Sequence, residues 1–208
     1  MHEHDSNGFY ELGRKRLFFA ILITFTGSLL EMWGSAVSHS VALWGDAWHM
    51  LADSSALVFS LVAIWLIKKY PNAKHFGEHH LAEVVASVIN CLFIFTIAIS
   101  IFVRVAGRLN SDYEVAGGLM LVVSIVGLAA NGVSAWLLWQ PGKKSLNIKG
   151  AFLHVVSDSL CSVAVILGAL MIYLTHLKWL DTLVGAAIGA VILLIGLNLA
   201  RKLARILG

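Results

Sequence analysis

The chain has 208 residues, of which 59% are hydrophobic and 13% are charged, and its formal net charge is +3. Soluble domains carry about 25% charged residues, so this composition excludes an ordinary soluble domain and indicates a membrane protein. The two cysteines, Cys91 and Cys161, stand alone in apolar runs, which excludes a disulfide framework and a paired-cysteine metal site.

Six apolar segments follow one another along the chain, each long enough to cross a bilayer as a helix of about 20 residues. They cover residues 17–37, 42–67, 81–103, 115–139, 148–173 and 180–200. We therefore expect an all-α integral membrane protein, a six-helix bundle that forms one transmembrane domain over residues 17–200. Residues 1–16 are expected to form an N-terminal tail and residues 201–208 a short C-terminal end.

The distribution of positive charge predicts the orientation of this bundle. Of the 15 Lys and Arg residues, all but three fall at the termini or in the loops on the same side; the three exceptions are Arg104, Arg108 and Lys178. Cytoplasmic loops carry the excess of Lys and Arg, so both termini are predicted to be cytoplasmic, in a multi-pass protein of the cell (inner) membrane. Because the charge lies in short segments beside the membrane, nucleic-acid binding is not expected.

A His-x-x-x-Asp-Ser pattern occurs twice in the apolar segments, as HMLADS from His49 and HVVSDS from His154. Residues four apart share one helical face, so His49 lies beside Asp53 and His154 beside Asp158. A charged carboxylate within the bilayer needs a compensating partner. Two imidazoles and two carboxylates are ligands of the type and number that tetrahedral Zn²⁺ accepts, so the pattern predicts a metal site between the second and fifth helices.

Other interpretations of these polar residues remain open. A hydrogen-bonded His–Asp pair explains one copy, and a proton relay without metal uses the same residues, but neither explains why the two pairs are alike. Asp46, on about the same face as His49, is a candidate for orienting that imidazole or carrying a proton, and a plain role at the start of the helix fits it equally. The remaining polar residues of the apolar segments are expected to hydrogen-bond between helices; they are Glu31, Glu83, Asn90 and Asn131.

Long stretches of the chain resemble the cation diffusion facilitators, particularly their zinc-transporting branch. The similarity is carried by SVALWGDAWHMLADSSALVFSLVA, by HLAEVVASVIN and by NIKGAFLHVVSDSLCSVAVILGAL, and GGLMLVVSIVGLAANGVSAWLL and the last helix led by Asp181 also fit. It covers nearly the whole chain from about residue 14. The resemblance implies a homodimeric antiporter, not an enzyme, that exports Zn²⁺, with Cd²⁺ as a second candidate, from the cytoplasm in exchange for protons by alternating access.

The resemblance also assigns roles to individual residues. The transport-site ligands of the family fall on His49, Asp53, His154 and Asp158, with zinc as the cargo and no separate cofactor. The family often has an auxiliary metal site in the loop after the second helix; here its candidates are His75, His79 and His80. That loop is one residue longer than usual and has Leu81 in place of a basic residue, so a solvated loop without metal is the alternative.

Two further expectations concern the end of the chain and the class of function. Many relatives continue into a soluble metal-binding domain that supports the dimer, whereas this sequence stops at RKLARILG, so we expect that domain to be missing and a dimer to rely on membrane helices. A passive divalent-cation channel is the main alternative function. A membrane metalloenzyme is a weaker one, because neither motif contains the water-activating Glu of an HExxH site.

Overall fold

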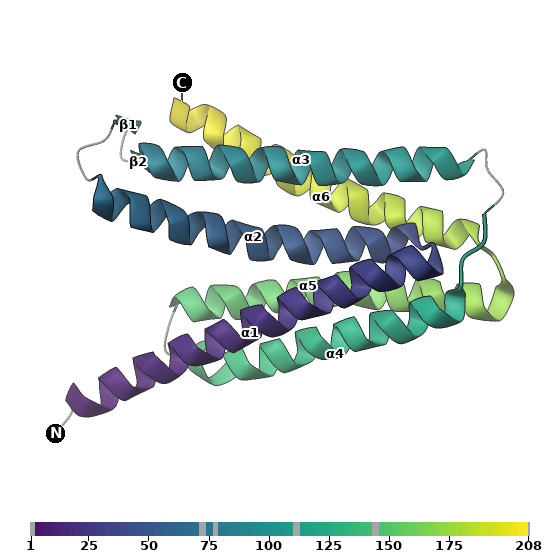
Figure 1. The fold of residues 1–208 in the computed structure, drawn as a ribbon, viewed down its shortest axis with the longest axis horizontal. Coiled ribbons are helices and arrows are strands. Elements are labelled where there is room, and N and C mark those ends of the chain that lie inside the picture. The colour runs from purple at the N-terminus through teal and green to yellow at the C-terminus, as the bar shows by residue number, and fades with distance from the viewer. Residues whose placement is uncertain (1–2, 71–73, 77–78, 110–112, 143–145, 208) are drawn as a thin grey trace.

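The computed structural model describes residues 3–70, 74–76, 79–109, 113–142 and 146–207. Within these ranges it has six helices, whose bounds are α1 Glu3–Ser38, α2 Val41–Lys69, α3 Leu81–Leu109, α4 Gly117–Gly142, α5 Leu146–Thr175 and α6 Trp179–Leu207. Each contains a stretch of 23 to 29 residues that is apolar enough to cross a membrane. The predicted all-α bundle with six spans is therefore confirmed. Both termini lie at the same end of the bundle (Figure 1), whereas their cytoplasmic location stays a prediction.

Several helices extend beyond the predicted apolar segments. Helix α1 begins at Glu3 rather than near residue 17, and α6 continues to Leu207 instead of ending near residue 200. Hydropathy marks only the part of a helix that lies in the hydrocarbon, whereas adding a residue to an existing helix is far easier than nucleating one. The C-terminal extension RKLARIL consists of residues that favour helices, and the N-terminal extension contains no proline.

The helices are arranged on two sides of α2. Helices α3 and α6 pack against each other and against α2, whereas α4 packs against α1 and α5 (Figure 1). Helix α1 contacts both α2 and α4, which connects the two sides. By comparison, α2 and α5 meet over a much shorter stretch. The two helices that carry the His-x-x-x-Asp motifs are thus positioned largely by their other neighbours.

Glycines let α6 approach its neighbours closely. A Cβ atom on Gly185 would lie 2.9 Å from Val41 Cγ1 of α2, and one on Gly189 would lie 3.0 Å from Ile101 Cγ2 of α3. Both separations are shorter than ordinary van der Waals contact, so larger residues would push the helices apart. This small-residue face of α6 is therefore used for packing within one molecule.

A buried carboxylate on α6 holds the start of α2. The Asp181 side chain accepts hydrogen bonds from Ser40 Oγ at 2.6 Å, Val41 N at 2.7 Å, Ala42 N at 3.1 Å and Arg108 Nη1 at 2.6 Å. Arg108, from the last turn of α3, also donates to the carbonyl of His39. An anion at a helix N-terminus satisfies free backbone N–H groups and interacts favourably with the helix dipole. Asp181 therefore joins three helices at the end of the bundle opposite the termini.

Candidate metal centre

Each predicted ligand pair lies on one face of its helix, as the spacing indicates. On α2, His49 Nδ1 is 3.6 Å from Asp53 Oδ2, and on α5, His154 Nε2 is 3.9 Å from Asp158 Oδ2. Both separations span one helical turn and are too long for direct hydrogen bonds. Within each helix the two side chains therefore do not hydrogen-bond to each other, and their ligand atoms are available to the opposite helix.

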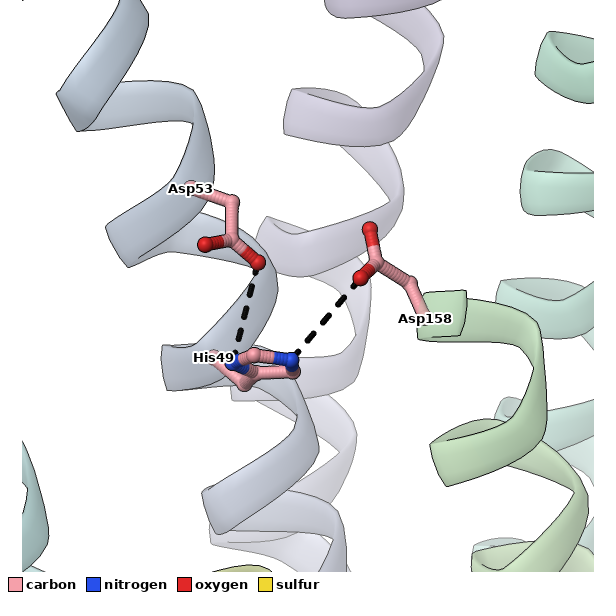
Figure 2. Close-up of side chains that lie close together, drawn as sticks. All are labelled: His49, Asp53 and Asp158. Atoms are coloured by element: carbon pink, nitrogen blue, oxygen red, sulfur yellow. Dashed lines mark ion pairs between the residues drawn. The ribbon is translucent and has the colours of Figure 1, made fainter. Parts of the chain in front are cut away.

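The fold brings the two pairs together. His49 Nε2 lies 3.8 Å from Asp158 Oδ1, and His154 Nε2 lies 3.2 Å from Asp53 Oδ2. Figure 2 shows His49 and Asp53 from one helix and Asp158 from the other around a common space. One ligand atom from each of these three residues lies within 4.8 Å of the others. Because zinc ligands at about 2.0 Å in a tetrahedron are about 3.3 Å apart, these atoms would have to approach one another by up to about 1.5 Å to give zinc geometry.

The two motifs differ in how far they are exposed. The side chains of Asp158 and His49 are 2% and 10% exposed, whereas those of Asp53 and His154 are 22% and 48% exposed. The exposed pair lies nearer to the end of the bundle that carries the termini, since α2 ends and α5 begins there (Figure 1). The more exposed ligand of each helix therefore lies one turn nearer to the termini, and His154 is the most exposed of the four.

Two carboxylate oxygens at this site lack hydrogen bonds. Asp53 Oδ2 and Asp158 Oδ1 are buried, and neither has a partner of hydrogen-bonding geometry among the described residues. A buried carboxylate without such partners is costly, and a divalent cation with nearby imidazoles would compensate for that cost. The donor set therefore fits a metal ion such as Zn²⁺, although its role as the binding site stays a prediction.

Asp46 lies inside α2 rather than at its start, one turn before His49. Its side chain is fully buried, and neither carboxylate oxygen has a hydrogen-bond partner in the described part of the chain. The expectation of a plain role at the start of the helix is therefore wrong, because α2 begins five residues earlier, at Val41. The alternative that Asp46 orients His49 has no hydrogen bond to support it.

The three loop histidines lie in a short hairpin between α2 and α3, made of β1 His75–Phe76 and β2 His79–His80. His80 Nε2 donates to the Tyr70 carbonyl at 2.9 Å, and its Nδ1 accepts from Ala82 N at 3.1 Å. His79 Nδ1 instead lies 3.6 Å from Glu83 Oε2, and the rings of His75 and His80 pack edge to face. Because backbone groups occupy both nitrogens of His80, this arrangement offers no three-histidine metal site, and the accessory role stays a prediction without geometric support.

Expected hydrogen bonds between helices form in some cases and not in others. Asn131 Nδ2 of α4 donates to Ser162 Oγ of α5 at 3.5 Å, as predicted. Glu31 does not behave this way, since it is fully buried in α1 and neither carboxylate oxygen has a partner among the described residues. Glu83 bonds locally, accepting from His80 N at 3.3 Å. The structure thus identifies Glu31 as an unexplained buried carboxyl group, which the sequence pattern had placed among ordinary polar contacts.

The chain is similar over most of its length to a family of membrane proteins. The family described as "Cation efflux transmembrane domain" matches residues 17–207. The chain is 37% identical over 188 residues to "Metal cation efflux system protein CzcD" of Cupriavidus metallidurans, which covers 90% of this chain and 58% of that protein. It is 34% identical over 195 residues to "Zinc transporter ZitB" of Escherichia coli, and this match covers 92% of the present chain and 62% of that protein.

A third relative is "Cadmium, cobalt and zinc/H(+)-K(+) antiporter" of Bacillus subtilis, 34% identical over 207 residues, covering 98% of this chain and 66% of that protein. The chain thus spans about three fifths to two thirds of the length of the curated relatives that it matches. The match nevertheless includes all six helices and both His-x-x-x-Asp motifs. The chain belongs to the cation efflux family, the cation diffusion facilitators, in their zinc-transporter branch.

Proposed function

We propose that this chain moves Zn²⁺, and also Cd²⁺, out of the cytoplasm across the cell membrane in exchange for protons. The observation that carries the proposal is the cluster of His49, Asp53 and Asp158, with His154 beside it, between two membrane-spanning helices. Asp53 Oδ2 and Asp158 Oδ1 have imidazole nitrogens nearby but no partner of hydrogen-bonding geometry among the described residues, and a divalent cation would compensate for their burial. The printed functions of the relatives, zinc transport and metal/proton antiport, point the same way.

Exchange for protons follows from the chemistry of the ligands. Imidazoles and carboxylates bind a metal ion only when they are deprotonated, so protons and Zn²⁺ compete for the same atoms. In the present arrangement, Asp53 and His154 are the more exposed ligands and receive the ion from the side of the termini. Transport then requires a second arrangement that opens the site to the other side, where protons displace the metal. The positive charges of the loops support a cytoplasmic location for both termini.

Two other functions make different predictions. A passive channel would conduct Zn²⁺ down its gradient without dependence on protons. A membrane metalloenzyme would need a general base beside the metal and an open coordination position for substrate, and the residues after His49 and His154 are Met50 and Val155 rather than Glu. Antiport fits the buried site and its titratable ligands better than either. A homodimer is proposed only on the family resemblance, and cross-linking in membranes would test it.

The decisive experiment measures Zn²⁺ and protons in the same vesicles. The purified chain is reconstituted in proteoliposomes, and Zn²⁺ uptake and internal pH are recorded together under an imposed pH gradient. We expect Zn²⁺ flux coupled to opposite proton flux, which stops in an Asp158→Asn variant that keeps the side-chain size. A Zn²⁺ flux that does not depend on the pH gradient would indicate a channel. The absence of Zn²⁺ flux in the wild type would contradict the proposed function.

A further inference from the structure

A second pair of acidic residues is buried beside the metal centre. Glu31 of α1 and Asp46 of α2 are both fully buried, and none of their four carboxylate oxygens has a partner of strict hydrogen-bonding geometry among the described residues, although the Ser162 hydroxyl lies near Asp46. The two carboxyl groups are close enough to interact electrostatically, and Asp46 in turn interacts with His49 and Asp158. The pair therefore adjoins the metal centre, although Glu31 itself is not one of the proposed ligands.

The structure provides a specific place for the Glu31 carboxyl group. A Cβ atom on Gly127 of α4 would overlap Glu31 Oε1 and would lie 2.7 Å from its Cδ. The carboxyl group thus occupies space that any other residue at position 127 would fill. One turn further along α4, the fully buried Asn131 also has an unpartnered Oδ1 atom. Helix α4 therefore accommodates an acidic group inside the bundle without supplying a cation to neutralise it.

The surroundings of Glu31 identify the cation that this group can hold. The titratable group that interacts with Glu31 is Asp46, and Asp46 interacts in turn with His49 from α2 and with Asp158 and Cys161 from α5. Helix α4 contributes Gly127 and Asn131, which do not titrate. Two ionised carboxylates without hydrogen bonds would cost many kcal/mol in such a site. A metal ion would need at least three ligands, and among the described residues only His49, Asp53 and Asp158 form such a group. A proton needs no ligand shell.

We propose that Glu31 binds a proton that is released when a divalent cation occupies the metal centre, so that a group outside the ligand set carries part of the exchanged charge. This inference rests on the proposed antiport. Before metal binds, the burial of Glu31 and the negative charge of the neighbouring Asp46 oppose its ionisation and keep it neutral. The positive charge of a bound divalent ion offsets that opposition, the O–H bond of Glu31 breaks, and its proton leaves to solvent. When the ion leaves, Glu31 takes up a proton again.

The test counts protons released for each Zn²⁺ bound. The purified chain in detergent is titrated with Zn²⁺ in weak buffer containing a pH indicator, and bound Zn²⁺ is measured in parallel. Glu31→Gln keeps the size of the side chain but cannot ionise, so it should bind as many Zn²⁺ ions as the wild type while releasing about one proton fewer per ion. The control variant is Glu114→Gln, at an exposed glutamate outside the helices, which should match the wild type.

The outcomes separate this inference from the proposed function. If the wild type releases protons and Glu31→Gln releases the same number, the role of Glu31 is wrong while antiport stands. If the wild type binds no Zn²⁺, or binds it without releasing protons, the proposed antiport fails and this inference fails with it.

A second measurement applies even if Glu31→Gln does not fold. Infrared difference spectra of the wild type should show that the carbonyl stretch of a protonated carboxyl group disappears when Zn²⁺ binds. Gly127→Ala should shift that band because the added methyl group displaces the Glu31 carboxyl. Gly132→Ala, in the same helix but with no atom within 4 Å of its new methyl group, should leave the band unchanged. No loss of the band in the wild type, or equal spectra for the two alanine variants, would overturn the proposal.

Discussion

The joint between Asp181 and the start of α2 should be a major source of stability. Replacing Asp181 with Asn keeps the shape of the side chain but removes its charge and one acceptor oxygen. The new amide would point N–H groups at donors, because the carboxylate now accepts from Ser40, Val41, Ala42 and Arg108. At least two of these four hydrogen bonds should be lost. Arg108, whose side chain is 15% exposed, would also lose its ion-pair partner.

The size of the effect follows from these contacts. A hydrogen bond to a charged group contributes about 1.5–3 kcal/mol. Removing one partner of a buried ion pair costs about 3–5 kcal/mol, because the other charge is left uncompensated. These two figures describe overlapping contributions and should not be added. We therefore expect Asp181→Asn to lower the free energy of unfolding by about 3–5 kcal/mol.

Thermal unfolding in detergent, followed by gel filtration, measures this loss. For a chain of this length, 1 kcal/mol shifts the melting temperature by about 2–4 °C, so the expected decrease is about 6–20 °C. Arg108→Gln alone should also destabilise, and adding it to Asp181→Asn should cost much less than it does in the wild type. A melting temperature within about 2 °C of the wild type for Asp181→Asn, or fully additive effects, would refute the role of the joint.

Four predictions concern the metal centre and the loop. Asp158→Ala should abolish most Zn²⁺ transport while the protein still inserts in the membrane; near-normal transport would remove the proposed site. Apparent Zn²⁺ affinity should fall from about pH 8 to about pH 5.5, because imidazoles protonate in that range and only deprotonated ligands bind metal; a constant affinity would exclude shared ligands. Changing His75, His79 and His80 together to Ala should reduce transport by less than about tenfold, and complete loss in a folded protein would show an essential loop site. His49→Asp should keep transport and raise the Cd²⁺ to Zn²⁺ ratio, because carboxylates can bind larger ions through both oxygens; an unchanged ratio in an active variant would show that packing sets selectivity.

The sequence predicts the parts of this molecule that depend on spacing along one helix. Apolar length alone predicts all six spans, because a lipid-exposed backbone must satisfy its hydrogen bonds internally and therefore forms helices. The spacing of four residues correctly places His49 beside Asp53 and His154 beside Asp158. The shared motif correctly indicates that the two pairs lie together. Helix ends are predicted less well, because the extensions of α1 and α6 lie outside the apolar segments.

Contacts between distant segments could not be predicted in the same way. Nothing in the spacing indicates that Asp181 reaches the N-terminus of a helix that begins 140 positions earlier in the chain. Similarly, His80 looks like a loop ligand in the sequence, whereas its two nitrogens bond to the backbone of Tyr70 and Ala82. Glu31 looks like an ordinary interhelical hydrogen-bonding residue, and only its position against Gly127 shows that it has no such partner.

The arrangement of the helices implies that an ion bound at the proposed site would also affect how α2 and α5 contact each other. Helix α2 is held by α6 and α3 through Asp181 and Arg108, whereas α5 is held mainly by α4, and the two ligand-bearing helices touch each other only briefly. Across this junction the separations between imidazole nitrogens and carboxylate oxygens are 3.2 and 3.8 Å, compared with about 3.3 Å between the ligands of a tetrahedral zinc ion. The 3.2 Å separation already matches zinc geometry, whereas the 3.8 Å separation between His49 and Asp158 would have to shorten by about 0.5 Å. A larger ion would need less movement there. Because α1 and α6 also connect the two sides of the bundle, a bound ion would strengthen the briefest of these contacts, the one between α2 and α5, and we expect its arrival and departure to shift these two helices relative to each other.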